Sequence, residues 1–409
     1  MKHRILLVIV LVLGANQFTQ SQIKDLKAWL EQPVDQRPHL GQTSFANKSL
    51  SKKEAMEASE LLYADAQKQF AARYNEQWEQ RELKFQDHSM PFFYNVFGEK
   101  PEDGRALFLS LHGGGGTAPE VNDRQYNNQK HLYDKTMEDL EGVYLAMRAP
   151  TNTWNMWHQD DIDDFINILI QMAVIKEGVN PNKVYLLGYS AGGDGLYQLA
   201  PRLADRLAGA SMMAGHPGDA SPNNLYNLPF ALHMGGKDAA YNRNGLAREW
   251  KMTLDSLATA NPGHYLHQAV IHEECGHWMN RQDAMALPWM AQYERNPYPE
   301  KVIWQQDNRY HEQFYWLWCH NFQPRAGKQI VAEYSKKDNS INIIKPYLDA
   351  IQVLINDEML NLNKPVVFMK NGEVLKKIKL DRTIQTIYQS LSVRIDPYYI
   401  FSTKVELKL

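Results

Sequence analysis

A serine flanked by glycines is the first residue of this sequence that could do chemistry. Ser190 lies in the run GYSAGG at 188–193, with small residues on both sides. Residues 184–189 form an apolar run typical of a strand buried on both faces, and residues 196–207 have helical spacing. A serine on such a tight strand-to-helix turn is strained and exposes its Oγ. The pattern predicts a nucleophile, although an ordinary serine in a glycine-rich turn remains the alternative.

A serine hydroxyl is a weak nucleophile and needs a histidine base that a carboxylate holds in the right tautomer. Asp238 follows a predicted strand in a Gly-Gly-Lys-Asp loop, and His277 follows the last predicted strand beside a glycine. Since acid and base follow the serine in that order in such folds, we expect these two residues to complete the set. The alternatives are His272 as the base and a plain turn aspartate at 238. Asp194 is too close to Ser190 to be the acid, so we expect it to cap a helix or line the pocket.

The oxyanion that develops during acyl transfer needs hydrogen-bond donors. The amide of Ala191, directly after the serine, would supply one. The loop HGGGG at 112–116 would supply a second from Gly114 or Gly115. This loop directly follows the predicted strand 106–111, which favours the oxyanion role over that of a flexible linker.

A metal site is the competing interpretation of the segment HEECGH at 272–277. Zinc-binding helices of this kind carry their two histidines four positions apart on one face. Here the second histidine lies one position further on, after a glycine. We therefore expect neither a metal nor another cofactor.

Aromatic residues are concentrated in the loops next to the predicted chemistry. Trp154 and Trp157 lie in the loop 148–158, and Trp278 follows the predicted base. These rings could stack on a sugar or on an aromatic acyl group of a substrate. Packing in the core or in a lid is equally compatible with the pattern, because large aromatic side chains supply much of the buried area of any protein.

The elements that must position these residues alternate between strands and helices. The strands are expected at 90–95, 106–111, 142–147, 184–189, 209–214, 229–234 and 267–271, and the helices at 160–175, 196–207 and 243–259. This alternation predicts an α/β fold with a doubly wound, mostly parallel sheet. Ligands bind at the carboxyl ends of the strands in such sheets, where all the loops named above would lie.

Two further segments flank this expected catalytic domain, which we place at 85–325. Residues 21–84 are predicted to be helical and to lie on the surface of the main domain. Their long helix, at 51–81, begins with a capping box of Ser51 and Glu54.

The residues after 325 differ in pattern from the main sheet. Short strands without crossover helices are expected at 341–344, 350–355, 366–370, 374–379 and 404–409, with a short helix near 383–391. Asn371-Gly372 is a strong hairpin signal between two of them. We predict a small, mainly β C-terminal domain over 326–409.

The N-terminus has the features of a secretory signal peptide. Lys2 and Arg4 precede the apolar run 5–13, and small residues follow it. We place the signal peptide at 1–20 and expect an exported, periplasmic or secreted protein. The run is too short for a comfortable membrane span, so no stable insertion is expected after processing, and an uncleaved anchor is the alternative.

Bulk composition excludes some partners. The net charge is −3 with 22% charged residues, which gives no indication of nucleic acid or of an anionic membrane as partner. Cys275 and Cys319 could form a disulfide in an oxidising compartment, but two thiols in a large chain do not make a disulfide framework. No feature specifies an oligomeric state.

With these residues placed, the chain resembles the α/β-hydrolase superfamily, in particular secreted serine esterases of the feruloyl esterase and polyhydroxybutyrate depolymerase type and the catalytic domain of prolyl oligopeptidases. The resemblance covers about half the chain, roughly 90–289, and depends on four motifs: HGGGG at 112, GYSAGG at 188, GGKD at 235 and CGHW at 275. It implies Ser190 as nucleophile, Asp238 as acid and His277 as base. The chain departs from prolyl oligopeptidases because the segment before residue 90 is too short for a propeller.

These observations predict an exported serine hydrolase that cleaves carboxylic esters through an acyl-enzyme. Its substrate would be a small-molecule ester or an ester attached to a polymer. A serine peptidase of the prolyl oligopeptidase type, acting on short peptides, is the first alternative. A glycan- or surface-binding protein is the second, with the C-terminal domain as the binding part.

Overall fold

An eight-stranded sheet forms the centre of the computed structural model, which describes residues 19–307, 309, 311–319, 327–345 and 347–409. In spatial order its strands are β1 (Glu82–Phe85), β2 (His88–Phe97), β4 (Gly142–Met147), β3 (Arg105–Leu111), β5 (Val179–Tyr189), β6 (Gly209–Met213), β7 (Phe230–Gly235) and β8 (His267–His272). The strands from β3 to β8 pair in parallel, and β1 and β2 add an antiparallel edge. The expected mostly parallel α/β-hydrolase sheet is confirmed.

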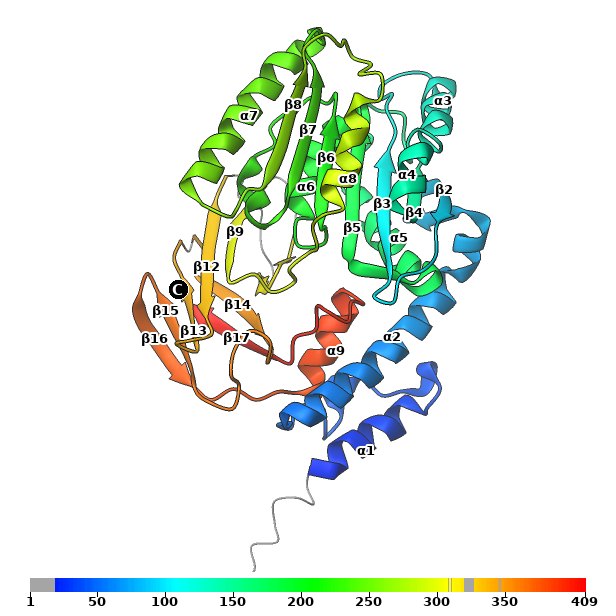
Figure 1. The fold of residues 1–409 in the computed structure, drawn as a ribbon. Coiled ribbons are helices and arrows are strands. Elements are labelled where there is room, and N and C mark those ends of the chain that lie inside the picture. The colour runs from blue at the N-terminus through cyan, green and yellow to red at the C-terminus, as the bar shows by residue number, and fades with distance from the viewer. Residues whose placement is uncertain (1–18, 308, 310, 320–326, 346) are drawn as a thin grey trace, which may run out of the picture.

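Helices cover both faces of this sheet, which explains why its central strands are apolar throughout (Figure 1). One face packs against α5 (Ile162–Glu177), α6 (Ala191–Arg202) and α7 (Arg243–Ala260). The other packs against α3 (Pro119–Gln129), α4 (Asp134–Leu140) and α8 (Ala286–Met290). α6 begins directly after Ser190 and not at residue 196 as the spacing predicts. Its glycines are poor helix formers, but they permit the close packing described below.

The C-terminal strands form two small sheets below the main one (Figure 1). The five-stranded sheet has the order β16 (Glu373–Ile378), β15 (Val366–Lys370), β13 (Ser340–Ile343), β12 (Gln329–Ser335) and β9 (Lys301–Gln305). The four-stranded sheet has the order β10 (Gln313–Phe314), β11 (Leu317–Trp318), β14 (Ala350–Ile355) and β17 (Thr403–Lys408). Three of these strands precede the predicted boundary at residue 326. β9 pairs with β12 of the C-terminal sheet. The β domain therefore begins at Lys301, the first residue of β9, and not at residue 326.

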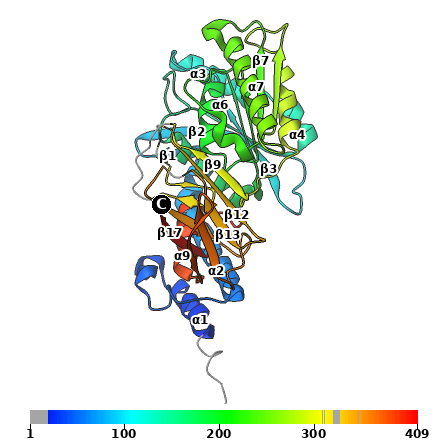
Figure 2. The same ribbon diagram turned by 90° about the vertical axis from the view of Figure 1, so that its left-hand side faces the viewer.

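The N-terminal helices connect the two parts of the molecule. α2 (Lys52–Gln80) starts with the predicted capping box. Its last turns bury Tyr74 and Trp78 in the main core. Its first turns pack with α1 (Thr19–Leu30) against the C-terminal helix α9 (Ile384–Val393), and Figure 2 shows α2 and α9 side by side. The segment thus spans the main and C-terminal domains and does not lie on the main domain alone.

A buried network of five charged residues joins the end of α6 to the chain around α9. Arg295 Nη2 lies 2.7 Å and Arg206 Nη1 3.6 Å from Asp396 Oδ2. Arg394 Nη2 lies 2.7 Å from Asp205 Oδ2. We call these residues the seam cluster. Because Asp205 and Arg206 follow α6 and Arg394 and Asp396 follow α9, their contacts fix the C-terminal domain on the catalytic domain.

The remaining predictions about the chain as a whole have mixed outcomes. Nearly all of the predicted signal peptide falls on residues 1–18, which lie outside the described residues. Among the described residues, no helix is both long and apolar enough to cross a membrane.

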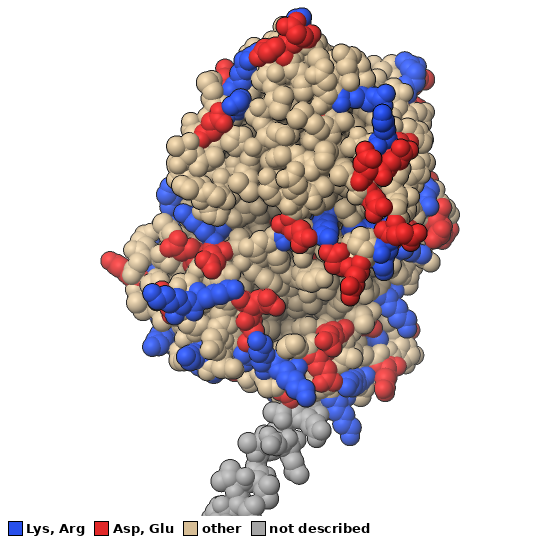
Figure 3. Space-filling model, in the orientation of Figure 1, with Lys and Arg blue, Asp and Glu red and all other residues tan. Residues whose placement is uncertain are grey.

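Cys275 and Cys319 are buried and free, so the disulfide that the sequence left open is not formed. On the face seen in Figure 3, acidic and basic side chains are interspersed and no broad area carries one sign.

Candidate active site

Ser190 sits on a strained turn between β5 and α6. Its backbone adopts φ 57° and ψ −118°, a conformation that non-glycine residues avoid. A Cβ on Gly188 would lie 2.1 Å from the carbonyl oxygen of Gly192, and a Cβ on Gly192 would lie 2.3 Å from that of Leu111. The two flanking glycines are therefore required for strand and helix to approach so closely. The Ser190 amide donates to the carbonyl of Met213 on β6, 2.9 Å away, which holds the turn against the sheet.

His277 connects this serine to Asp238. Its Nε2 lies 2.9 Å from Ser190 Oγ, and its Nδ1 lies 2.7 Å from Asp238 Oδ2. A carboxylate accepts the Nδ1 proton, so Nε2 is left to accept the serine proton. The Asp238 side chain is 3% exposed and that of His277 is 42% exposed. The arrangement is buried at the acid and open to solvent at the base.

The loops that carry these two residues are tied to each other at the ends of β7 and β8. The Gly236 amide donates to the carbonyl of His272, and the Lys237 amide donates to that of Cys275. The side chain of His272 itself points elsewhere: its Nε2 lies 3.2 Å from Nδ1 of His233, and its Nδ1 lies 3.1 Å from Oε1 of Gln282. The structure therefore places His277, and not His272, beside the serine.

The two histidines of the HEECGH segment consequently face different partners. Among the described residues, no group of three or more histidine, cysteine, aspartate and glutamate side chains is placed to hold a metal ion. The buried His233–His272 pair instead braces the strands from which the acid and the base loops emerge.

The glycine loop after β3 offers one of its two predicted donors. The Gly115 amide already donates to Oδ1 of Asn122, 3.0 Å away, and Nδ2 of Asn122 donates back to the Gly115 carbonyl at 3.0 Å. The expectation that Gly115 could be a donor is therefore wrong. Gly114 remains, together with Ala191, which as the first residue of α6 has no carbonyl partner within its helix. Gly114 has φ 118°, and a Cβ there would lie 2.0 Å from Oδ1 of Asn122.

Hydrogen bonds of the His112 ring hold this loop in place. Its Nε2 accepts the Ala149 amide at 3.1 Å, so the proton sits on Nδ1, which donates to the Gly113 carbonyl. Burial lowers the pKa of His112 to about 4, so the ring is neutral near pH 7. The carbonyl of His112 accepts a 2.8 Å hydrogen bond from Nε1 of Trp157.

This contact corrects the expected role of Trp157. The residue is fully buried in the main core beneath the loop, where it fixes His112 and cannot touch a substrate. Trp154, three residues earlier, is 71% exposed and lines the pocket beside the serine. Trp278 is 49% exposed and packs on the ring of Tyr189, outside the lining of that pocket.

The pocket beside Ser190 has a volume of about 390 Å³, within the range of small-molecule sites. It is lined by Gly114, Gly115, Gly116, Trp154, His158, Ala191, Asp194, Gln198, His216, Gly218, Tyr241 and Arg243. Asp194 lines it as expected, and its Oδ1 accepts the His216 amide at 2.6 Å. Sequence reasoning missed Asn122, Tyr241 and Arg243. The sequence held a signal only for Tyr241 and Arg243, because they follow the predicted acid Asp238 by a few residues.

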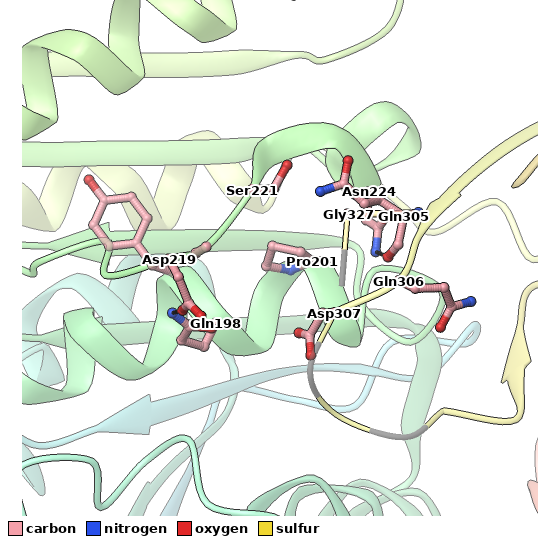
Figure 4. Close-up of a pocket in the computed structure, with 11 residues that line it drawn as sticks. Gln198, Pro201, Asp219, Ser221, Asn224, Gln305, Gln306, Asp307 and Gly327 are labelled. Carbon is pink, nitrogen blue, oxygen red and sulfur yellow. Dashed lines mark hydrogen bonds between the residues drawn. The ribbon is translucent and has the colours of Figure 1, made fainter. Parts of the chain in front are cut away.

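A second pocket lies where the C-terminal domain meets α6 (Figure 4). Gln198 and Pro201 of α6 form one wall, and Gln305, Gln306 and Asp307, at and after the end of β9, form another. Gln198 also lines the pocket beside Ser190. Gln198 thus lies between the pocket at the C-terminal domain and the pocket of the candidate active site.

The sheet order, the strained serine turn and the Ser190–His277–Asp238 contacts define a class: a protein of α/β-hydrolase fold with a serine–histidine–aspartate arrangement. No family model matches the chain. A curated relative, the putative esterase NocK of Nocardia uniformis subsp. tsuyamanensis, is 31% identical over 115 residues, which are 28% of this chain and 33% of the relative. The chain thus matches about a third of the length of that relative.

Solved structures resemble this chain over about half of its length. A thermostable esterase shares 16% identity at a TM-score of 0.39, covering 52% of this chain and 62% of its own. A ferulic acid esterase shares 15% at a TM-score of 0.38, covering 52% and 96%. An acetyl xylan esterase from Aspergillus awamori shares 11% at a TM-score of 0.39, covering 51% and 97%.

Proposed function

We propose that this protein is a serine hydrolase that cleaves carboxylic esters, with Ser190 as nucleophile, His277 as base and Asp238 as the acid that orients it. The observation that carries the proposal is the pair of contacts on His277, 2.9 Å to Ser190 Oγ and 2.7 Å to Asp238 Oδ2. The partial match to a putative esterase supports an ester as the substrate.

Acylation would begin when Ser190 Oγ attacks the ester carbonyl while His277 Nε2 takes its proton. Asp238 would stabilise the imidazolium through the hydrogen bond at Nδ1. The amides of Ala191 and Gly114 would donate to the oxyanion of the tetrahedral intermediate. His277 would then return the proton to the leaving alcohol, and a water activated by the same residue would hydrolyse the acyl-enzyme.

Labelling with a fluorophosphonate probe tests the nucleophile. We expect stoichiometric labelling of the wild type and none of Ser190→Ala. Ser256→Ala is the matched control, because Ser256 is exposed on α7 and only donates to the carbonyl of Met252. Persistent labelling of Ser190→Ala would show that another residue reacts.

The class of substrate needs a separate measurement, since a peptidase would use the same acyl chemistry. Chromogenic short-chain esters and aminoacyl amides of the same chromophore should be compared on one preparation. We expect kcat/KM to be higher for the esters. A preference for the amides would favour the peptidase alternative, and labelling without turnover of either would leave a binding role for the C-terminal domain as the better account.

Export is also a proposal, and its basis is the residue pattern at 1–20. Sequencing the N-terminus of protein recovered from its native cells tests it. A mature chain that starts near residue 21 would support export, and a chain that still starts at Met1 would contradict it.

A further inference from the structure

Arg243 is a charged residue of the active-site pocket that the proposed chemistry does not use. It is the first residue of α7, its side chain is 13% exposed, and it lines the pocket together with Gly114 and Ala191. Its Nη1 lies 4.0 Å from Asp238 Oδ1, at the outer limit of an ion pair. Its Nε is buried and has no hydrogen-bond partner among the described residues.

A buried guanidinium nitrogen without a partner is costly, because its N–H has left water without a replacement acceptor. Arginine is the side chain whose planar donors match a carboxylate in two places. An arginine that only supported Asp238 would be expected to lie within hydrogen-bond distance of it. The observed 4.0 Å contact leaves donors free on a group that faces the pocket.

The turn before Arg243 holds the guanidinium in this position. Tyr241 and Asn242 have φ of 55° and 56°, two consecutive left-handed residues that are not glycine. Such strain persists where the surroundings impose it, and it gathers at functional sites. The Arg243 guanidinium carbon lies 4.9 Å from the centroid of the Tyr241 ring, which is 78% exposed at the pocket rim. The ring thus covers one face of the cation and keeps it beside the pocket.

The other polar groups of the pocket do not neutralise Arg243 by direct contact. Asp194 is the acidic residue of the lining, and its Oδ1 accepts the His216 amide. No ion pair joins Asp194 and Arg243 within the described residues; burial raises the pKa of Asp194, and the charge of Arg243 acts against that rise without a direct contact. Burial lowers the pKa of His158 to about 4, so this residue adds no charge at neutral pH. The N-terminus of α7 adds positive partial charge on the same side.

We propose that Arg243 binds a carboxylate of the substrate, so that the preferred esters carry an anionic group within reach of Ser190. This proposal rests on the proposed function, and it names the class of substrate for the same site. The carboxylate can belong to the acyl or to the alcohol part of the ester, and the experiment separates the two.

Matched ester pairs provide the test. On the acyl side, para-nitrophenyl monoesters of succinate, glutarate and adipate are compared with their methyl esters. On the alcohol side, para-acetoxybenzoate is compared with its methyl ester. We expect the wild type to favour the anionic member of one series in kcat/KM. In Arg243→Gln this ratio should fall by about ten- to a hundredfold, the usual loss when a charged hydrogen bond is removed. Arg243→Lys should restore part of the ratio, because the charge remains without the fork.

Arg248→Gln is the control, since Arg248 lies on the same helix but forms an exposed ion pair with Glu273. Its ratio should equal that of the wild type. An unchanged ratio in Arg243→Gln would overturn the proposal. If kcat/KM then also falls equally for anionic and neutral esters, Arg243 acts only as a support for Asp238. If no ester of either kind is hydrolysed and Ser190 is not labelled by the fluorophosphonate probe, the proposed function itself has failed.

Discussion

The molecule contains two networks of ionisable groups that differ in what they leave open. In the seam cluster, the Arg206, Arg295 and Asp396 side chains are at most 1% exposed. Asp396 accepts from Arg295 through Oδ2 and from the Tyr398 amide through Oδ1. Both oxygens of Asp396 thus accept from the protein, and its side chain is closed to solvent, so an outside ligand has no access to it. Nη2 of Arg206 is buried there without a hydrogen-bond partner among the described residues.

The trio of Ser190, His277 and Asp238 shows the opposite organisation. Its members form a single line of contacts, the His277 side chain is 42% exposed, and Ala191, the residue after the serine, lines a pocket. A line of contacts that ends in an open nucleophile is suited to receive a substrate, whereas a cluster closed to solvent is suited to hold two domains together. Access to solvent, and not charge alone, separates the two roles.

Removing the base should give the largest effect on the open network. His277→Ala should lower kcat by about 10⁴-fold or more, because the residues of such a trio act as a unit. Chromogenic ester hydrolysis measures kcat, and the melting temperature should change little since His277 is exposed. His272→Gln is the comparison, because that side chain contacts His233 and Gln282 and not Ser190. Since it supports the strands that carry the acid and base loops, we expect a loss much smaller than in His277→Ala. A loss as large in His272→Gln as in His277→Ala would contradict the assignment of the base.

Breaking the closed network should act on folding and leave the chemistry intact. Asp396→Asn removes the charge that Arg206 and Arg295 share, and an uncompensated buried charge typically costs about 3–5 kcal/mol. We expect the urea midpoint to fall accordingly, with kcat of the folded enzyme within a factor of about two. A selective loss of kcat at unchanged stability would show that the seam cluster belongs to the active site.

The loop below the oxyanion position should give a smaller effect that links structure to rate. Asn122→Ala frees the Gly115 amide and carbonyl and loosens the loop that presents Gly114. Since removal of one oxyanion donor costs about 10²–10³-fold in kcat, a misplaced donor should cost up to about 10²-fold, with little change in KM. Asn127→Ala on the exposed face of α3 is the control. An unchanged kcat in Asn122→Ala would argue against Gly114 as a donor.

How much of this site could be predicted depends on how local the signal is. Ser190 and its glycines form one continuous motif, and the strain at that turn follows from steric contacts only two residues away. Asp238 and His277 could be predicted from chain order and from their place after strands. The tie between Gly115 and Asn122 could not, because it depends on where α3 returns to the glycine loop.

The tryptophans and the domain boundary show the same limit. Trp154 and Trp157 share a loop and differ by three positions, yet one is exposed and the other lies in the core, because burial is set by the packing of β3 against α6. β9 was missed since its partner β12 is more than twenty residues further along the chain. The Asn371-Gly372 hairpin was predicted correctly, because a two-residue turn is specified by its own residues.

The smallest predicted effect is the pH dependence of the closed network. Burial alone would raise the pKa of Asp396, but Arg295, Arg206 and Arg394 outweigh it and hold the pKa below its usual value. A carboxyl with a lowered pKa in the folded state stabilises the protein above its unfolded value of about 4, and this contribution is lost as the pH falls through the folded-state pKa. For one proton the change is at most about 1.4 kcal/mol per pH unit.

Urea unfolding of the wild type and Asp396→Asn, measured between pH 6 and pH 3, isolates this contribution from that of the other carboxylates. The difference in unfolding free energy between the two proteins should be constant at the upper end and shrink toward pH 3. Ser190→Ala should follow the wild-type curve throughout, since a serine does not titrate and the open network leaves the seam untouched. A difference that grows as the pH falls would mean that the arginines do not hold Asp396 ionised, and the distinction between a closed seam and an open site would lose its electrostatic basis.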